Sequence, residues 1–194
     1  MRVNKIFYTL QGEGFHTGEP AVFVRLSGCN LRCPFCDTKH RQGTEMSETE
    51  VCAAVSLFPA TLVVVTGGEP SLQLTHSLVD ALHQMGKTVA VETNGTRPLP
   101  QNIDWVTLSP KDAFLGEVAK PVLTEADELK IIFDGVHRPA TYDNILVRHA
   151  RFLQPCDTGN EQRNNVIVGQ TVEYIKQNPL WRLSLQTHKL IGIE

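Results

Sequence analysis

Short runs of apolar and β-branched residues, separated by helical patterns, constrain the fold of this chain more than any other feature. Near-continuous apolar character over so few residues is typical of parallel strands that are covered on both faces. We expect strands at residues 20–27 (PAVFVRLS), 61–66 (TLVVVT), 88–93 (TVAVET), 103–108 (IDWVTL), 128–133 (ELKIIF) and 181–186 (WRLSLQ), with a shorter candidate at 151–154 (RFLQ).

Amphipathic segments lie between these runs. Residues 47–58 begin with the Ser-x-x-Glu spacing of a capping box, which predicts a helix. In residues 74–85, three leucines and a methionine mark one face, and Gly86 supplies a stop. Residues 138–149 are a weaker helix candidate, and residues 162–177 are a stronger one that ends before a proline.

Alternating strands and helices predict right-handed βαβ units and a parallel sheet. A complete eight-stranded barrel takes ~250 residues, whereas this chain has 194. We therefore expect an α/β fold, a partial, open (β/α) barrel, as a single domain over residues 1–194. The loops at 13–20 and 112–126 have no assigned structure.

The charge and hydropathy of the chain limit its partners. The net charge is −3, which argues against a nucleic-acid duplex or an anionic membrane because both require a cationic face. No apolar run approaches the ~18 residues of a membrane span, and residues 1–8 do not resemble a signal peptide. We expect a cytoplasmic protein with no direct nucleic-acid or membrane partner.

Polar residues and glycines follow the predicted strands at the points where they end. In open α/β sheets, ligands bind outside the carboxyl ends of the strands. The segments at these ends are 28–38, 66–70, 92–95, 109–111 and 155–157. Since parallel strands end at the same edge of a sheet, these segments predict an active site on one rim of the barrel.

Three of the five cysteines form the most specific signal: Cys29, Cys33 and Cys36 have C-x3-C-x2-C spacing. In a reducing compartment such a cluster is more typical of a metal site than of disulfides. A structural zinc site needs four ligands, which Cys52 or His40 would have to complete. A cubane iron–sulfur cluster has four irons, so three thiolates leave one iron open. Cys52 is better explained as a packed helix residue.

The cysteine spacing closely resembles that of the radical S-adenosylmethionine superfamily, and residues 66–70 (TGGEP) resemble its second motif. The resemblance implies a [4Fe–4S] cluster whose open iron binds the amino and carboxylate groups of S-adenosylmethionine. One electron then cleaves this cofactor to a 5′-deoxyadenosyl radical. Glycine suits the second motif because it lets the backbone approach the ligand closely. The residues expected around S-adenosylmethionine are Phe35, Cys36, Asp37, Gly67, Gly68, Glu69, Glu92, Asn94, Ser109, Pro110, Lys111, Gln154, Pro155, Cys156 and Asp157.

Further motifs together resemble one family of this superfamily, the 7-carboxy-7-deazaguanine synthases. They are residues 9–14 (TLQGEG), 24–26 (VRL), 36–39 (CDTK), 91–95 (VETNG), 108–111 (LSPK) and 186–189 (QTHK). The resemblance implies a lyase that converts 6-carboxy-5,6,7,8-tetrahydropterin to 7-carboxy-7-deazaguanine with loss of ammonia, on the pathway to queuosine in tRNA. It also implies Mg²⁺, a homodimer on a shortened barrel, and an external one-electron donor such as a flavodoxin.

The N–H donors on the edge of such a pterin could be read by Gln11, Glu13 and the backbone at Leu10 and Gly12. Arg25 lies in an apolar strand, where a charge is costly unless an anion meets it, so it is our candidate for the substrate carboxylate. A surface role for Glu13 and an internal ion pair for Arg25 are the alternatives.

The resemblance makes Thr38 the Mg²⁺ ligand, although a threonine here could equally be a turn residue. One hydroxyl is chemically sufficient, because Mg²⁺ keeps water or substrate oxygens as its other ligands. Thr66, His188 and the α-carboxylate of Glu194 complete the expected substrate contacts.

Two other functions remain open from the sequence. A glycyl-radical activase also combines a cysteine triplet with a Gly-Gly-Glu motif, but it would leave Arg25 and Thr38 without an evident use. A non-catalytic zinc or iron–sulfur module would need only the cysteines.

Overall fold

The computed structural model describes residues 1–38 and 40–194; Lys39, the last residue of the 36–39 motif, lies outside the described residues. The strands of this part form one nine-stranded sheet in the order β3-β1-β2-β4-β5-β6-β7-β8-β9. The strands are β1 (Arg2–Leu10), β2 (Pro20–Leu26), β3 (Thr44–Glu45), β4 (Leu62–Gly67), β5 (Thr88–Thr93), β6 (Trp105–Leu108), β7 (Glu125–Phe133), β8 (Leu146–Pro155) and β9 (Trp181–Leu183).

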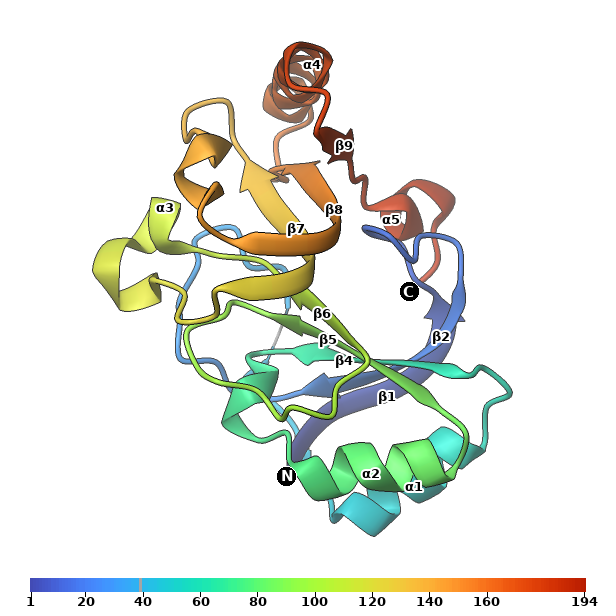
Figure 1. The fold of residues 1–194 in the computed structure, drawn as a ribbon. Helices are drawn as coiled ribbons and strands as arrows, with labels where there is room; N and C mark the ends of the chain where they lie inside the picture. Colours follow the sequence, from blue (N-terminus) through green and yellow to red (C-terminus); the bar gives the residue numbers. More distant parts are fainter. Residues whose placement is uncertain (39) are drawn as a thin grey trace.

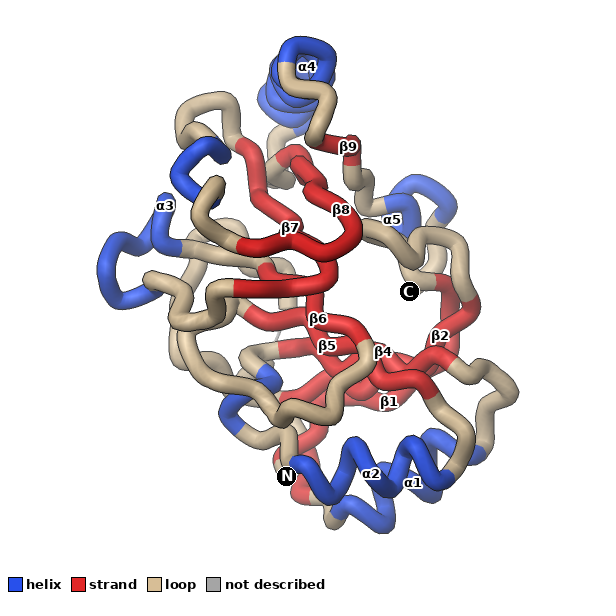
Figure 2. The backbone as a smooth tube through the Cα atoms, in the orientation of Figure 1, coloured by secondary structure: helices blue, strands red, loops and turns tan. Residues whose placement is uncertain are grey.

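The sheet curls into an open barrel with helices on its outside (Figures 1 and 2). Strand β2 and strands β4 to β9 pair in parallel, as expected, whereas β1 pairs antiparallel with both β2 and β3. The helices are α1 (Glu48–Ser56), α2 (His76–Gln84), α3 (Asp112–Leu115), α4 (Glu161–Gln177) and α5 (Thr187–Ile191), with short 3₁₀ turns η1 (Pro70–Leu72), η2 (Gly116–Ala119) and η3 (Pro139–Tyr142). The expected shortened, open barrel is confirmed.

The helix α5 and the end of the chain occupy the opening between β9 and the β1–β2 pair (Figure 1). The Thr187 amide donates to the Gly12 carbonyl at 2.9 Å, and Lys5 Nζ donates to Glu194 Oε2 at 2.6 Å. The C-terminal segment therefore closes the gap that the missing strands of a full barrel would otherwise fill.

Alternation along β2 separates the two sides of the barrel wall. Val22, Val24 and Leu26 pack against α1 and α2 in the outer core, while Ala21 and Phe23 belong to a separate cluster with Phe7, Leu62, Val64 and Ala90. A third core forms where β6 to β8 meet α4. Because successive strand residues face opposite sides, the outward positions stabilise the fold and the inward positions shape the interior.

Most expected elements are observed. The capping box at Ser47 and Glu50 is present and begins α1. Helix α2 ends at the predicted stop, where Gly86 has φ +70°. Helix α4 matches the 162–177 prediction to within one residue.

The helix expected at 138–149 is wrong. This stretch contains η3 and the first residues of β8, which runs from Leu146. Leu146 and Val147 pair with Glu125 and Ala126 of β7, so pairing with a neighbouring strand overrides a weak helical pattern.

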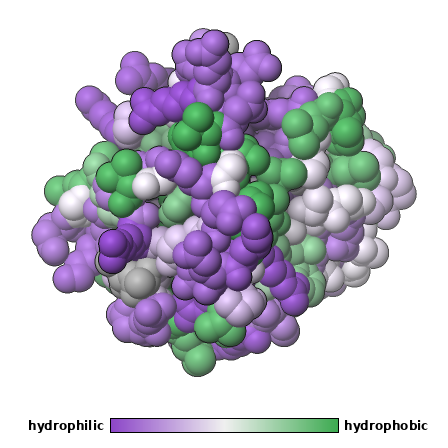
Figure 3. Space-filling view, turned by 90° about the horizontal axis from the view of Figure 1, so that it is seen from above, coloured by the Kyte–Doolittle hydropathy of each residue, from purple (hydrophilic) through white to green (hydrophobic). Residues whose placement is uncertain are grey.

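The surface is mixed in polarity: the face seen in Figure 3 is largely hydrophilic, with separate apolar patches between the polar side chains. Among the described residues, no helix is both long enough and apolar enough to cross a membrane.

Close contact between the loops after β2 and β4 depends on a glycine. The Gly68 amide donates to the Leu26 carbonyl and the Glu69 amide donates to the Gly28 carbonyl, both at 2.9 Å. A Cβ atom at position 68 would lie 1.8 Å from the Gly28 carbonyl oxygen, so the two loops would have to separate.

We therefore expect Gly68→Ala to lower the free energy of unfolding by about 2–3 kcal/mol. The matched control is Gly169→Ala on α4, where a Cβ would meet nothing within 4 Å; it should raise stability by about 0.5–1 kcal/mol because alanine favours helix. Urea unfolding of the metal-free, reduced protein measures both. Equal effects of the two substitutions would contradict the proposed loop contact.

Candidate active site

A cavity of about 430 Å³ lies inside the barrel and opens at the carboxyl ends of its parallel strands. Its lining includes every site residue expected from the sequence except Pro110, which is buried behind the rim. The lining that sequence reasoning did not single out consists of Phe7, Phe23, Leu31, Thr93, Lys130, Ile132, Gln186 and Lys189. The strand ends thus converge on one site, as the topology requires.

The three clustered cysteines all reach this cavity as free thiols. They lie on the loop after β2, where the Cys36 amide donates to the Cys33 carbonyl at 3.2 Å and the Leu31 amide donates to Cys29 Sγ at 3.4 Å. Burial raises the pKa of the Cys29 and Cys33 thiols. Metal coordination counters this effect because it favours the thiolate.

The three thiols do not form a ready-made site for a single ion in the described part of the chain. Among the described residues, no three histidine, cysteine, aspartate or glutamate side chains converge closely enough to hold one metal ion. Zinc would require its ligand sulfurs within ~2.3 Å of one centre, whereas an iron–sulfur cluster binds each cysteine through a different iron. Cys52 lies on α1, packed against the outer core and outside the cavity lining, so it does not complete a zinc site.

Glu69 of the Gly-Gly-Glu motif is almost fully buried, at 1% exposure. Its carboxylate accepts hydrogen bonds from the Ser71 amide at 3.0 Å, the Thr93 hydroxyl at 2.6 Å and the Asn94 amide at 2.8 Å. The side chain therefore joins the ends of β4 and β5, and this connection fixes the backbone at the cavity edge.

Asn94 extends this connection to the cysteine loop, because its Nδ2 donates to Asn30 Oδ1 at 3.1 Å. On the next strand end, Lys111 Nζ donates to the Ser109 hydroxyl at 2.7 Å and to its carbonyl. Burial lowers the pKa of Lys111 to about 8.

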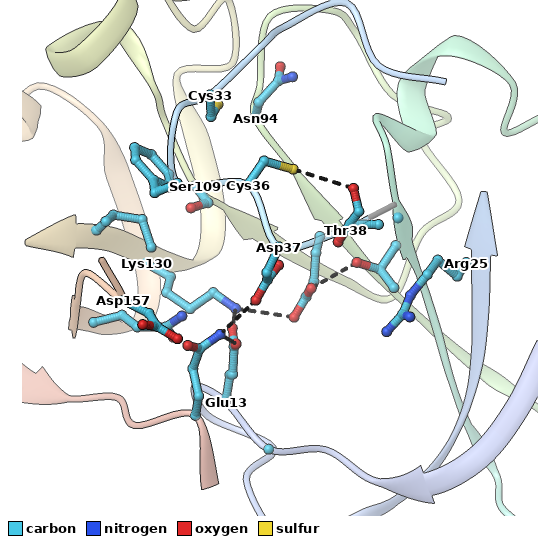
Figure 4. A pocket seen from close by; sticks show the side chains of 18 of the residues that line it. Glu13, Arg25, Cys33, Cys36, Asp37, Thr38, Asn94, Ser109, Lys130 and Asp157 are labelled. Carbon is cyan, nitrogen blue, oxygen red and sulfur yellow. Dashed lines mark hydrogen bonds and ion pairs between the residues drawn. The ribbon is translucent and has the colours of Figure 1, made fainter. Parts of the chain in front are cut away.

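Deeper in the barrel, Lys130 of β7 lies between two carboxylates (Figure 4). Its Nζ donates to Glu13 Oε2 at 2.6 Å and to Glu92 Oε1 at 3.2 Å. Despite burial, the Lys130 ammonium lowers the pKa of Glu13 to about 2, and the carboxylates raise the pKa of Lys130. Glu13 is 15% exposed at its side chain, so the surface alternative for this residue is wrong.

The signal for Lys130 was present in the sequence. Residues 128–133 were identified as a strand, and a lysine in such a run needs a buried anion for the same reason as Arg25. The partners could not be read from the sequence, because Glu13 lies 117 residues away from Lys130.

Arg25 has a different environment from Lys130. Its guanidinium carbon lies 4.9 Å from the centre of the Phe7 ring, which stacks on Phe23 at 5.1 Å. Among the described residues, no carboxylate forms an ion pair with Arg25. The expected internal ion pair is therefore not observed, and the guanidinium is available to an anionic ligand.

Thr38 lines the same cavity, directly after Cys36 and Asp37, and Figure 4 shows these side chains around the space that Arg25 and Lys130 also face. Lys189 Nζ contacts Asp37 Oδ2 at 3.2 Å and Asp157 Oδ2 at 2.9 Å. The C-terminal segment is thus tied both to the cysteine loop and to the end of β8.

His188 and Glu194 reach the cavity from this C-terminal segment. His188 packs directly on the backbone of Gly12, where a Cβ would lie 2.2 Å from the imidazole Nδ1. The Glu194 side chain pairs with Lys5.

Comparisons with known proteins agree with this geometry. Residues 23–113 match the Radical SAM superfamily. A 7-carboxy-7-deazaguanine synthase of Bacteroides thetaiotaomicron is 51% identical over 192 residues, which cover 99% of this chain and 98% of that protein. The enzyme of the same name from Nitratidesulfovibrio vulgaris is 40% identical over 220 residues. The match covers 99% of this chain and 98% of that protein.

A solved structure extends the similarity to the fold. The crystal structure of QueE from Escherichia coli has a TM-score of 0.75 and 30% sequence identity to this chain, covering 95% of it and 92% of the QueE chain. Identity at this level over nearly the full length of its relatives shows that the chain belongs to the 7-carboxy-7-deazaguanine synthase family of the radical S-adenosylmethionine superfamily.

Proposed function

We propose that this protein converts 6-carboxy-5,6,7,8-tetrahydropterin to 7-carboxy-7-deazaguanine with loss of ammonia, in the biosynthesis of 7-deazapurines such as queuosine. The observation that carries the proposal is one cavity with thiols at its rim and, inside, both an ionised carboxylate and a guanidinium that forms no ion pair with the described residues. Relatives that share up to 51% identity bear the name of this activity.

Cys29, Cys33 and Cys36 would hold a [4Fe–4S] cluster, and the loops after β4, β5, β6 and β8 would hold S-adenosylmethionine. When bound, this pair supplies one-electron chemistry for removing a hydrogen atom from the substrate. Glu69 does not need to touch the cofactor, because its carboxylate already binds three protein donors. Its role is to fix the backbone of Gly67 and Gly68 at the rim.

The residues inside the barrel would orient the pterin. Glu13 stays ionised and can only accept hydrogen bonds, so it suits the N–H donors of the ring edge. Gln11 shares this face, because its Nε2 donates to Glu92 Oε1 at 3.2 Å. Arg25 is available to bind the substrate carboxylate through two parallel hydrogen bonds.

We further propose that Thr38 and the substrate carboxylate together bind Mg²⁺, and that Thr66, His188 and Glu194 contact the substrate. One protein hydroxyl suffices, since Mg²⁺ retains water and substrate oxygens. A homodimer, a flavodoxin-like electron donor and a cytoplasmic location complete the proposal, on the strength of the family resemblance.

The other functions are not favoured. A glycyl-radical activase would act on a protein, and a cavity of about 430 Å³ that contains Arg25 and Glu13 suits a small anionic ligand instead. A zinc module is disfavoured because, in the described part of the chain, the cysteines do not surround a single-ion position.

An anaerobic assay tests the reaction. Reconstituted protein with S-adenosylmethionine, dithionite, Mg²⁺ and the carboxypterin should form the deazaguanine and release ammonia. Formation of 5′-deoxyadenosine without the deazaguanine would reject the substrate while keeping the superfamily chemistry.

Two cysteine variants test the cluster ligands. Cys33→Ala should abolish iron binding and activity, because it removes one of three thiolates. Cys52→Ala should retain about four irons and lose only packing energy, about 1 kcal/mol, since Cys52 packs on the outer core. Iron analysis and the cluster's visible absorption measure the difference, and equal iron loss in both variants would show that the ligands are misassigned.

A threonine pair tests the Mg²⁺ proposal. Thr38→Ala should raise the Mg²⁺ concentration at half-maximal activity on the order of tenfold, equivalent to about 1.4 kcal/mol. Thr49→Ala changes an exposed position on α1 and should leave the Mg²⁺ dependence unaltered. An unchanged Mg²⁺ titration for Thr38→Ala would contradict the assignment.

A further inference from the structure

Lys130 is a buried charge that connects several strands inside the barrel. Its side chain is 6% exposed, and its Nζ bridges Glu13 on the loop after β1 to Glu92 on β5. Through Glu92, the same network reaches Thr66 on β4, whose hydroxyl donates to Glu92 Oε2 at 2.9 Å. Through Glu13, it reaches Gln186, whose Nε2 donates to Glu13 Oε1 at 2.9 Å.

The surrounding charges show what Lys130 does for these carboxylates. The groups that face it are the Glu13, Glu92 and Glu128 carboxylates and the Lys111 ammonium. Burial alone would raise the pKa of Glu13, and the Lys130 charge reverses that effect. Burial does raise the pKa of Glu128, whose Oε1 is buried without a hydrogen-bond partner among the described residues.

The protonation state of Glu13 decides which ligand edge it can read. An ionised carboxylate only accepts hydrogen bonds, whereas a protonated one also donates one. A ring edge with an amino group beside a ring N–H offers two donors. A ring with a carbonyl in place of that amino group presents an acceptor, which a carboxylate repels.

We propose that Lys130 is a specificity-determining positioning residue: by bridging Glu92 and Glu13, it holds the Glu13 carboxylate in place as an acceptor and makes the site select a 2-amino pterin edge over a 2-oxo edge. The inference rests on the proposed function for the choice of a pterin ring. It assigns to Lys130 an indirect role, since Glu13 is the group that would touch the ring.

The experiment compares equilibrium binding of 6-carboxypterin and its 2-oxo counterpart, 6-carboxylumazine, to the reconstituted anaerobic protein, followed by ligand fluorescence. Wild type should bind the pterin at least 100-fold more tightly, since a buried polar site discriminates strongly against a mismatched group. In Lys130→Met this ratio should fall at least tenfold. Lys130→Arg keeps the charge and should retain most of the ratio.

The control is Lys120→Met, at an exposed lysine whose Nζ lies 3.7 Å from the Glu117 carboxylate. It should leave the ratio unchanged. Wild type that binds both rings equally, or neither, would overturn the proposal. So would a Lys130→Met variant that keeps full discrimination.

The pH dependence separates this electrostatic role from simple packing. In wild type, the Glu13 pKa is below its ordinary value of 4.5, so its contribution to stability is present above that value and disappears only as the pH falls through about 2. In Lys130→Met, burial raises the Glu13 pKa instead. Relative to wild type, the variant should therefore gain stability as the pH falls towards 4.5. A variant whose stability changes with pH in the same way as wild type would contradict the proposal.

The binding test also separates this inference from the proposed reaction. Wild type that discriminates between the rings but forms no deazaguanine would reject the reaction and keep the role of Lys130. If wild type forms the deazaguanine while Lys130→Met still discriminates between the rings as wild type does, the proposed reaction stands and the role of Lys130 is rejected.

Discussion

The rim of the site depends on the parallel pairing of β2 with β4 and of the strands that follow. Parallel strands end at the same edge, so residues from separate parts of the chain meet there without any specific long-range signal. The close approach of Gly68 to Gly28 then sets the cysteine loop against the loop after β4. The Glu69 carboxylate adds the next strand end to the same unit.

Inside the barrel, charge is the organising constraint. A buried ammonium or carboxylate is tolerated only when it is paired, and Lys130 satisfies both Glu13 and Glu92. Arg25 lies on the same side of the barrel wall but lacks an ion-pair partner among the described residues, and its guanidinium lies against the Phe7 ring. The contrast separates a charge whose partners are protein carboxylates from one that is suited to bind an anionic ligand.

Much of this arrangement could be predicted from the sequence, because near-continuous apolar runs such as 20–27 and 61–66 indicate buried parallel strands. Strand β1 was not predicted: polar residues interrupt it, and a bulge between Val3 and Lys5 shifts its alternation. The helix expected at 138–149 failed because pairing with β7 is invisible to local periodicity. The site residues followed from their places at strand ends and from the family resemblance. For Lys130 the sequence shows a lysine in a buried strand but not its partner, because Glu13 lies 117 residues away.

The alternation along β2 has a consequence for how such a protein can change. Val22, Val24 and Leu26 secure the helices, while Phe23 and Arg25, one residue away, line the ligand space. Ligand preference and folding stability are therefore encoded on interleaved positions of the same strand. Substitutions at Phe23 or Arg25 therefore change ligand contacts without altering the positions that pack against the helices.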